Sequence, residues 1–346
     1  MKIKKAIGRQ SVSYENKVYV RASACVVGKK EGEGPLGKCF DYVENDPYFG
    51  EKTWEKAESK LQEKTLDLTL NKGELKSEDI RYLVAGDLLG QLIATSFGVA
   101  KYNIPFFGVY GACSTMGETL SLASMLIESG YAKNTMALTS SHFASAEKQF
   151  RFPLDYGNQR PRSATWTVTG SAGVILSSQK CEYNLVSGRK SVVITGVTTG
   201  KIMDYGVKDS MNMGACMAPA AADVILANLK DFGRNVEDYD KIITGDLGYV
   251  GSKILKDLLA KEDINLNNHM DCGIEIYDSS LQDTHSGGSG CGCSGVVLSG
   301  FIFRKLCKGD YKRVLFIPTG ALLSPVSFNE GDTIPSIAHG IVFESE

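Results

Sequence analysis

Residues 108–130 read GVYGACSTMGETLSLASMLIESG, and the rest of the sequence can be organised around this stretch. Residues 105–110 are apolar and aromatic, which predicts the end of a buried strand. Gly111 and Ala112 follow as a tight turn, and apolar residues at helical spacing predict a long helix beginning at Cys113. The helix dipole and unpaired amides there favour a thiolate, so Cys113 is a candidate nucleophile. The alternative is a small buried side chain in a turn.

The composition is that of a globular chain with no sign of secretion or nucleic-acid binding. The chain has 346 residues, of which 43% are hydrophobic and 23% charged, and its formal net charge is −2. This charge gives no reason to expect nucleic acid as a partner. The basic N-terminus lacks the apolar core of a signal peptide, and no run reaches the roughly 18 apolar residues of a membrane span. We therefore expect neither segment.

The cysteines and glycines predict neither a metal nor a cofactor. Nine scattered cysteines are typical of free thiols in a reducing compartment. Cys291 and Cys293 could join Cys272 or Cys307 around a metal, but the spacing matches no usual zinc pattern. Residues 287–292, GGSGCG, lack the spacing and the strand–turn–helix context of a dinucleotide site.

A repeat divides the sequence into two like halves, 1–180 and 181–346. Residues 81–88, RYLVAGDL, recur as DKIITGDL at 240–247. Three further matches follow in the same order: Cys113–Ser114 with Cys293–Ser294, 135–139 with 315–319, and 170–175 with 336–342. Each half is a series of strands and helices, including strands over 134–140 and 166–176, so we expect two similar α/β units packed together.

Two tandem halves, with a cysteine at a helix start in the first and a glycine-rich turn in the second, resemble the thiolase and β-ketoacyl synthase superfamily. That resemblance implies a five-layered αβαβα sandwich. Residues 108–124, 150–173 and 283–300 are more specifically similar to the stage V sporulation protein AD family of endospore-forming bacteria.

The second resemblance implies a function in sporulation and germination. It implies a subunit of the complex that moves dipicolinic acid into and out of spores, binding dipicolinic acid or its calcium chelate in the former active-site pocket. Such a subunit would sit peripherally at the spore inner membrane beside other stage V sporulation A membrane proteins. The superfamily also implies a homodimer, which we expect to pair through the apolar strand 135–140.

The catalytic residues of condensing enzymes are only partly matched. Those enzymes join a nucleophilic cysteine to a histidine and a second histidine or asparagine from the second half. Cys113 matches the nucleophile, but Asp246 stands where the first histidine is expected, and an anion there would repel an enolate. We therefore interpret the protein as a non-catalytic binder. One alternative is an active acyltransferase using Cys113 and His285 on an acyl-CoA, and another is a purely structural subunit.

The predicted ligand-binding set combines the resemblance with residue chemistry. His142 follows a strand and could line the pocket, and Arg162 could pair with a carboxylate; exposed loop positions are the alternative for both. Gly320 lies where the superfamily supplies backbone donors near the cysteine. The full predicted set is Cys113, His142, Arg162, Asp246, His285, Ser286, Gly287 and Gly320.

Overall fold

The structure, a computed structural model, describes residues 5–150, 160–180 and 190–346. The strands are Ala6–Ile7 (β1), Ser11–Gly28 (β2), Tyr42–Glu44 (β3), Tyr82–Gly86 (β4), Phe106–Gly108 (β5), Asn134–Ser141 (β6), Trp166–Thr167 (β7), Gly170–Ser177 (β8), Val192–Thr199 (β9), Lys241–Thr244 (β10), His269–Asp271 (β11), Gly288–Ser289 (β12), Arg313–Ile317 (β13), Thr319–Ala321 (β14) and Ser336–Ser345 (β15). The helices are Lys29–Gly32 (α1), Trp54–Gly73 (α2), Ile93–Val99 (α3), Thr115–Glu128 (α4), Phe143–Phe150 (α5), Met213–Phe232 (α6), Gly248–Ala260 (α7), Cys272–Glu275 (α8), Cys291–Val297 (α9), Phe303–Lys308 (α10) and Pro325–Asn329 (α11).

All described strands except β7 and β12 form one sheet whose two halves repeat each other, and β7 and β12 pair in a small separate sheet. The order is β11-β10-β13-β15-β9-β2-β8-β6-β4-β5, so the second half from β9 outward follows the same plan as the first half from β2 outward. The four sequence matches fall on corresponding elements, such as β4 with β10 and β6 with β13. The expected boundary at 180/181 lies between β8 and β9, beside residues 181–189, which are outside the described part of the chain.

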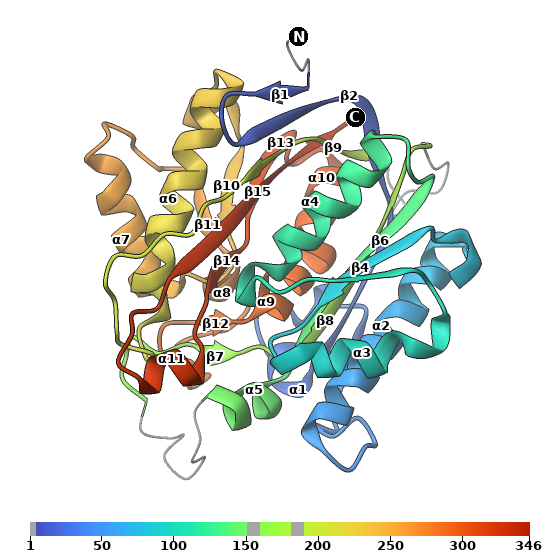
Figure 1. Ribbon diagram of the computed structural model, residues 1–346, viewed down its shortest axis with the longest axis horizontal. Coiled ribbons are helices and arrows are strands. Elements are labelled where there is room, and N and C mark those ends of the chain that lie inside the picture. The colour runs from blue at the N-terminus through green and yellow to red at the C-terminus, as the bar shows by residue number, and fades with distance from the viewer. Residues whose placement is uncertain (1–4, 151–159, 181–189) are drawn as a thin grey trace.

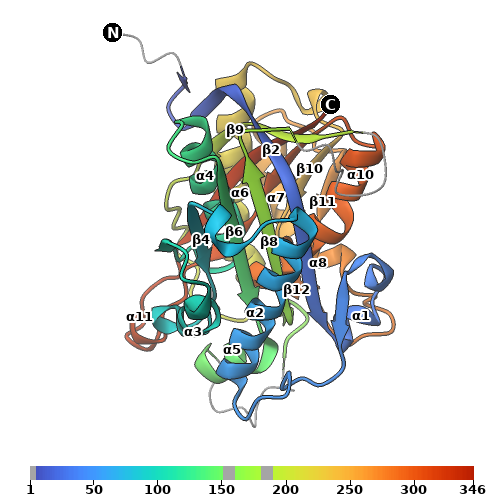
Figure 2. The same cartoon turned by 90° about the vertical axis from the view of Figure 1, so that its right-hand side faces the viewer.

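Helices fill the space between the two halves and cover both outer faces. Figure 1 shows α4 and α9 between the halves of the sheet, with α6 and α7 over one outer face. From the side, α2 and α3 cover the opposite face (Figure 2). The predicted five-layered α/β architecture is confirmed.

The central helices are apolar on several sides because sheet surrounds them. Met116 and Leu120 of α4 and Cys293 and Val297 of α9 are fully buried in the main core cluster between the halves. A helix buried on several faces needs small and apolar residues where its neighbours approach, and α9 has the sequence CGCSGVV. The start of α9 and the turn before α4 are thereby held near each other.

Three expected strands differ from the structure. The run 105–110 is not a buried strand end, because β5 pairs with β4 alone and lies at the edge of the sheet with all three residues exposed. The strand expected over 166–176 is divided: β7 leaves the main sheet to pair with β12, and β8 begins at Gly170. The strand 135–140, expected to be a free edge, is the interior strand β6 between β4 and β8.

Within the described residues, no helix has the length and apolar character needed to cross a membrane.

Candidate ligand-binding site

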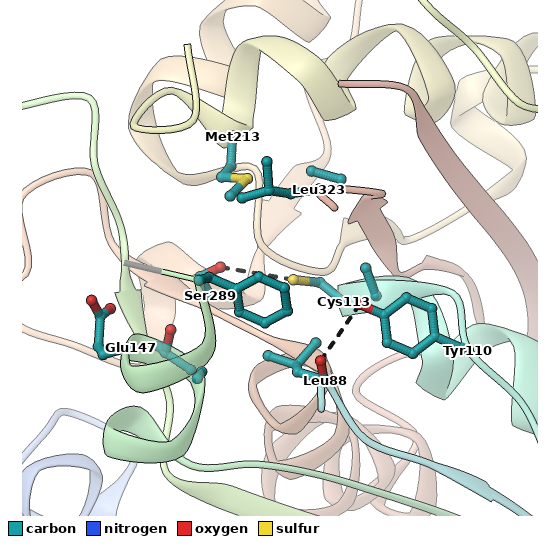
Figure 3. A pocket seen from close by; sticks show the side chains of 12 residues that line it. Leu88, Tyr110, Cys113, Glu147, Met213, Ser289 and Leu323 are labelled. Atoms are coloured by element: carbon teal, nitrogen blue, oxygen red, sulfur yellow. Dashed lines mark hydrogen bonds between the residues drawn. The ribbon is translucent and has the colours of Figure 1, made fainter. Parts of the chain in front are cut away.

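A narrow cavity opens beside the turn that precedes α4. Its volume is about 50 Å³, which is room for a few water molecules on this measure. Figure 3 shows Cys113 and Ser289 facing each other inside it, with Met213 and Leu323 opposite. The described residues that line it are Leu88, Tyr110, Ala112, Cys113, Ala146, Glu147, Phe150, Thr167, Met213, Ser289, Ala321 and Leu323.

Cys113 lies in a 3-10 turn, Ala112–Ser114, between the edge strand β5 and helix α4. Ala112 has a φ of 50°, a conformation uncommon for a residue with a side chain, and it turns the chain sharply before the helix. Gly320 in β14 packs directly against this turn, because a Cβ there would come within 2.2 Å of the Gly111 carbonyl oxygen. Gly320 is therefore brought to the Cys113 turn, although its role as a donor stays a prediction.

Asp246 is buried behind the cavity and is held by three donors. It follows strand β10, and its carboxylate accepts hydrogen bonds from the Gly290 amide at 2.9 Å, the Ser289 hydroxyl at 3.2 Å and the Thr319 hydroxyl at 2.9 Å. The residue is 1% exposed. Burial raises the pKa of Asp246 to about 7, although the donated hydrogen bonds oppose the shift.

Ser289 connects Asp246 to Cys113 and is the site residue that sequence analysis missed. It lies on β12, and its hydroxyl oxygen is 3.8 Å from the Cys113 sulfur. The arrangement therefore brings together a thiol, a carboxyl and a hydroxyl from both halves. The sequence did contain a signal for Ser289, because this residue occurs just before the helix start that repeats the Cys113 turn. The predicted set instead took residues 285–287 from the same glycine-rich stretch.

The environment of Cys113 opposes the thiolate that its sequence position suggested. Burial and the neighbouring Asp246 carboxylate raise the pKa of the Cys113 thiol well above its ordinary value. The expectation of an activated thiolate is therefore wrong, because desolvation and a like charge outweigh the helix dipole. A thiol in this form is a poor nucleophile.

None of the four histidines is among the residues that line the cavity. His285 instead has both ring nitrogens engaged, Nδ1 with the Pro161 carbonyl oxygen at 2.8 Å and Nε2 with Asp283 at 2.9 Å. The proposed pairing of Cys113 with His285 therefore lacks support in the geometry. The signal was ambiguous because a histidine in a glycine-rich turn can face either side of it.

Ser286 and Gly287 have packing roles outside the cavity. The Ser286 hydroxyl accepts a hydrogen bond from the Val250 amide at 3.3 Å, beside the start of α7. Gly287 has a φ of 117°, and its carbonyl accepts from the Trp166 amide at 2.8 Å, which aligns β12 with β7. These two residues position Ser289 and do not line the cavity.

His142 and Arg162 also lie away from Cys113. His142 is buried, its Nε2 lies 2.8 Å from the Pro47 carbonyl oxygen, and burial lowers its pKa. It lines a separate cleft near Trp54 and Trp166. Arg162 is exposed on the loop before β7. The structure thus joins Cys113, Asp246 and Gly320 of the predicted set and separates the others from them.

No group of three or more histidine, cysteine, aspartate or glutamate side chains suited to a metal occurs in the described part of the chain. Cys291 and Cys293 are instead buried thiols that contact the backbone carbonyls of Ser140 and Gly245.

Comparisons with known proteins agree in sequence and in fold. The sequence model of the family described as stage V sporulation protein AD matches residues 8–344. A protein of that description from Bacillus subtilis (strain 168) is 44% identical over 341 residues, covering 98% of this chain and 98% of that protein.

Solved structures of condensing enzymes share the fold at low sequence identity. The 3-oxoacyl-[acyl-carrier-protein] synthase III of Aquifex aeolicus VF5 is 12% identical with a TM-score of 0.55, over 94% of this chain and 99% of that chain. The corresponding enzyme of Pseudomonas aeruginosa PAO1 is 11% identical with a TM-score of 0.56, over 95% and 98%. Xanthomonas campestris OleA with bound lauric acid and lauroyl-CoA is 12% identical with a TM-score of 0.55, over 95% and 99%. These likenesses concern the fold alone.

Proposed function

Because the chain belongs to the stage V sporulation protein AD family, we propose that it serves sporulation and germination as a non-catalytic subunit that binds dipicolinic acid or its calcium chelate in the Cys113 cavity. The family places the protein in sporulation and the fold is that of condensing enzymes. The proposal has three further parts: the identity of the ligand, the complex that moves it, and a peripheral position at the spore inner membrane beside other stage V sporulation A proteins.

One observation carries the non-catalytic assignment: Asp246 occupies the position of the expected histidine and is joined through Ser289 to Cys113. Condensation needs a reactive thiolate and donors that stabilise a developing negative charge. Here burial and the neighbouring carboxyl raise the pKa of the thiol, and the carboxyl places negative charge where the enolate would form. The site retains a cavity and loses the groups that would drive the reaction.

The charge of the cavity favours a neutral form of the ligand. Its described lining contains the acidic Glu147 and neither lysine nor arginine, and Asp246 lies directly behind Ser289. A free dicarboxylate brings two negative charges that must be compensated when they leave water. Chelation of Ca²⁺ neutralises both charges, and calcium accepts further oxygen ligands from carboxyl and hydroxyl groups.

The narrowness of the cavity requires movement on binding. A volume of about 50 Å³ is small for an aromatic ring with two carboxylates. Met213 and Phe150 line the cavity and are half-buried, and a methionine side chain adapts readily to a new shape. We therefore expect binding to displace side chains at this wall.

Calorimetry tests the proposed function directly. The purified protein is titrated with calcium dipicolinate, with dipicolinate in the presence of a chelator, and with acetyl-CoA. We expect saturable one-site binding for calcium dipicolinate, weaker binding for dipicolinate alone and no heat from acetyl-CoA. The proposal would be overturned if acetyl-CoA bound and neither form of dipicolinate gave measurable heat.

Binding of dipicolinate without calcium should strengthen as the pH falls from 8 to 6. The raised pKa of Asp246, about 7, means that its charge is present at pH 8 and largely lost at pH 6, whereas the ligand's carboxylates stay ionised throughout. We expect an increase of about three- to tenfold in affinity. In Asp246→Asn this dependence should flatten; an unchanged slope would show that Asp246 is not near the ligand.

We further propose a homodimer that pairs through β5 and not through the expected strand 135–140. Phe106 and Phe107 are 40% and 50% exposed on this edge strand, whereas β6 has no free edge. An uncovered apolar edge is a liability that pairing with a second copy removes, and two copies of an edge strand run antiparallel when they pair across a two-fold axis. The strand leads into Tyr110, which lines the cavity.

Phe107→Lys should convert this dimer to a monomer at micromolar concentration, as measured by light scattering. Charge repulsion across the two-fold axis and the loss of apolar burial both oppose pairing. The matched control is Leu281→Lys, which places the same charge on an exposed residue of the second half and should leave the dimer intact. A monomeric parent protein would contradict the assembly.

A further inference from the structure

Two buried carboxyl groups lie in the first half, next to residues that line the Cys113 cavity. Glu58 of α2 and Asp87, which follows β4, are both fully buried. Asp87 has the place in the first half that Asp246 has in the second, because both lie within the recurring Gly-Asp-Leu. The hydrogen bonds that this pair accepts come from hydroxyl and amide groups.

A chain of hydrogen bonds connects the two carboxyl groups. The Gln62 amide donates to the Thr95 hydroxyl at 2.8 Å and to the Ser140 hydroxyl at 2.7 Å. Thr95 in turn donates to Asp87, and Ser140 donates to Glu58 at 2.7 Å. The two acids therefore belong to one buried network, and the charge of one affects the ionisation of the other.

The donors around the pair favour a proton on Glu58. Asp87 accepts from the amides of Leu89 at 2.7 Å and Thr95 at 2.8 Å, and an amide N–H can only donate. Burial raises the pKa of Asp87, and these donors oppose the rise. Glu58 meets two serine hydroxyls, which accept as well as donate. Burial and the charge of Asp87 raise the pKa of Glu58 far above its ordinary range, so Glu58 is neutral near pH 7.

The elements packed around Glu58 contribute few other charges. Glu55 of the same helix adds to the raised pKa of Glu58, but it is paired with Lys148 of α5 at 2.6 Å. The elements α3, β6 and β8, which pack on α2, contain no ionisable residue. Arg21 of β2 lies at the other end of α2, where it donates to the Gly73 carbonyl at 3.0 Å.

Two further titratable groups near Glu58 are neutral at this pH. Burial raises the pKa of the Cys291 thiol of α9 and lowers the pKa of His142, which precedes α5. Glu147 of α5 lines the cavity. Asp87 is thus the main charge that opposes ionisation of Glu58.

Helix α5 joins this network to the cavity. The Ser145 hydroxyl of α5 lies 2.5 Å from the Glu58 carboxyl, and Ala146 and Phe150 of the same helix line the cavity. Figure 2 shows α5 beside α2. Helix α5 has 8 residues, whereas α2 has 20 and contributes to two core clusters, so α5 is the element that moves more easily. An ionised Glu58 needs water, and displacement of α5 admits it.

We propose that the proton on Glu58 holds α5 against α2 and keeps the Cys113 cavity closed, and that loss of this proton to solvent releases α5 so that a ligand can enter or leave. Only the ligand in this inference rests on the proposed function. Once the ligand is inside, α5 returns and Glu58 regains its proton. The proton therefore changes the rates of entry and exit and leaves the affinity to the cavity.

Hydrogen exchange of the full-length protein tests this closure without any ligand. The closed form is favoured at low pH and loses stability as the pH rises from the ordinary pKa of a glutamate, about 4.3, towards the raised one. The exchange rate of the α5 amides, divided by the intrinsic rate at each pH, should therefore rise about tenfold or more between about pH 6 and pH 8. Helix α6 is the internal reference and should show no such rise.

Glu58→Gln is the variant that identifies the group responsible. Its side-chain amide can accept from Ser140 and donate to Ser145, as neutral Glu58 does, so α5 should stay protected at both pH values. A flat profile assigns the pH dependence to Glu58 and not to Asp246, whose pKa of about 7 lies in the same range. Ser145→Ala removes the contact with α5 and should raise its exchange at low pH about threefold to tenfold. A parent protein without pH dependence, or a Glu58→Gln variant that retains it, would overturn the proposal.

A second measurement connects the closure to the ligand. Release of calcium dipicolinate after rapid dilution should accelerate over the same pH range in the parent protein and not in Glu58→Gln. An unchanged release rate in the parent would overturn the gating step. If calcium dipicolinate does not bind at all, the proposed function fails, whereas hydrogen exchange still decides whether Glu58 controls α5.

Discussion

Replacing Cys113 with leucine should abolish binding of calcium dipicolinate and leave the fold intact. Leucine adds two heavy atoms to a side chain that faces a cavity of about 50 Å³, so it occupies the space that the ligand needs. We expect calorimetric affinity to fall by about a hundredfold or more. Overpacking costs about 1–3 kcal/mol, so the melting temperature should stay within several degrees of the parent.

The matched control is Cys113→Ser, which keeps the cavity open and removes the thiol. A binding site that does no chemistry through sulfur should accept this change with less than about a threefold loss of affinity. An enzyme using Cys113 as its nucleophile would lose its activity completely. Equal binding by the leucine and parent proteins would place the ligand elsewhere.

The second large effect concerns acyl transfer, which we expect to be absent. The raised pKa of the Cys113 thiol and the lack of a histidine in the described lining leave the sulfur poorly activated. After incubation with acetyl-CoA or malonyl-CoA, intact-mass spectrometry should show unmodified protein. A stable acetyl adduct at Cys113, followed by turnover, would restore the enzyme interpretation.

Asp246→Asn should make Cys113 more reactive and so measure how much the neighbouring carboxylate adds to the effect of burial. With the amide oxygen facing Gly290 and Ser289, the amide nitrogen can donate to the Thr319 hydroxyl, so the hydrogen bonds are retained without the charge. Each unit by which the pKa of the thiol falls increases the thiolate fraction about tenfold. We expect alkylation of Cys113 at pH 8 to accelerate by about that factor, while alkylation of Cys39 stays constant.

The sequence predicted the fold well because the repeat constrains it. Matching strands such as β4 and β10, found by the recurring Gly-Asp-Leu, imply matching places in a two-fold arrangement. The sequence analysis placed the edge of the sheet at the wrong strand, because composition does not show which strands pair with each other. The run around Phe106 and Phe107 is apolar in the way a buried strand is, yet β5 has a neighbour on one side only.

The candidate site was predicted in part for a similar reason. Cys113 and Asp246 each follow a strand at the same end of the sheet, so the sheet topology brings the two residues together. Ser289 depends on how β12 pairs with β7, through a backbone hydrogen bond from Trp166 that no side-chain pattern encodes. The pKa of Cys113 depends on distance and burial, which the helix position alone cannot supply.

Protection of Cys113 from alkylation tests the central claim most directly, because it uses the unaltered protein and identifies the site. The protein is treated with a small thiol reagent with and without saturating calcium dipicolinate, and modification is quantified by peptide mass spectrometry. Cys39 is also partly exposed and lies outside the lining of the cavity, so it serves as the internal reference. The account predicts slower alkylation of Cys113 and an unchanged rate at Cys39. Saturated binding that leaves the rate at Cys113 unchanged would contradict it.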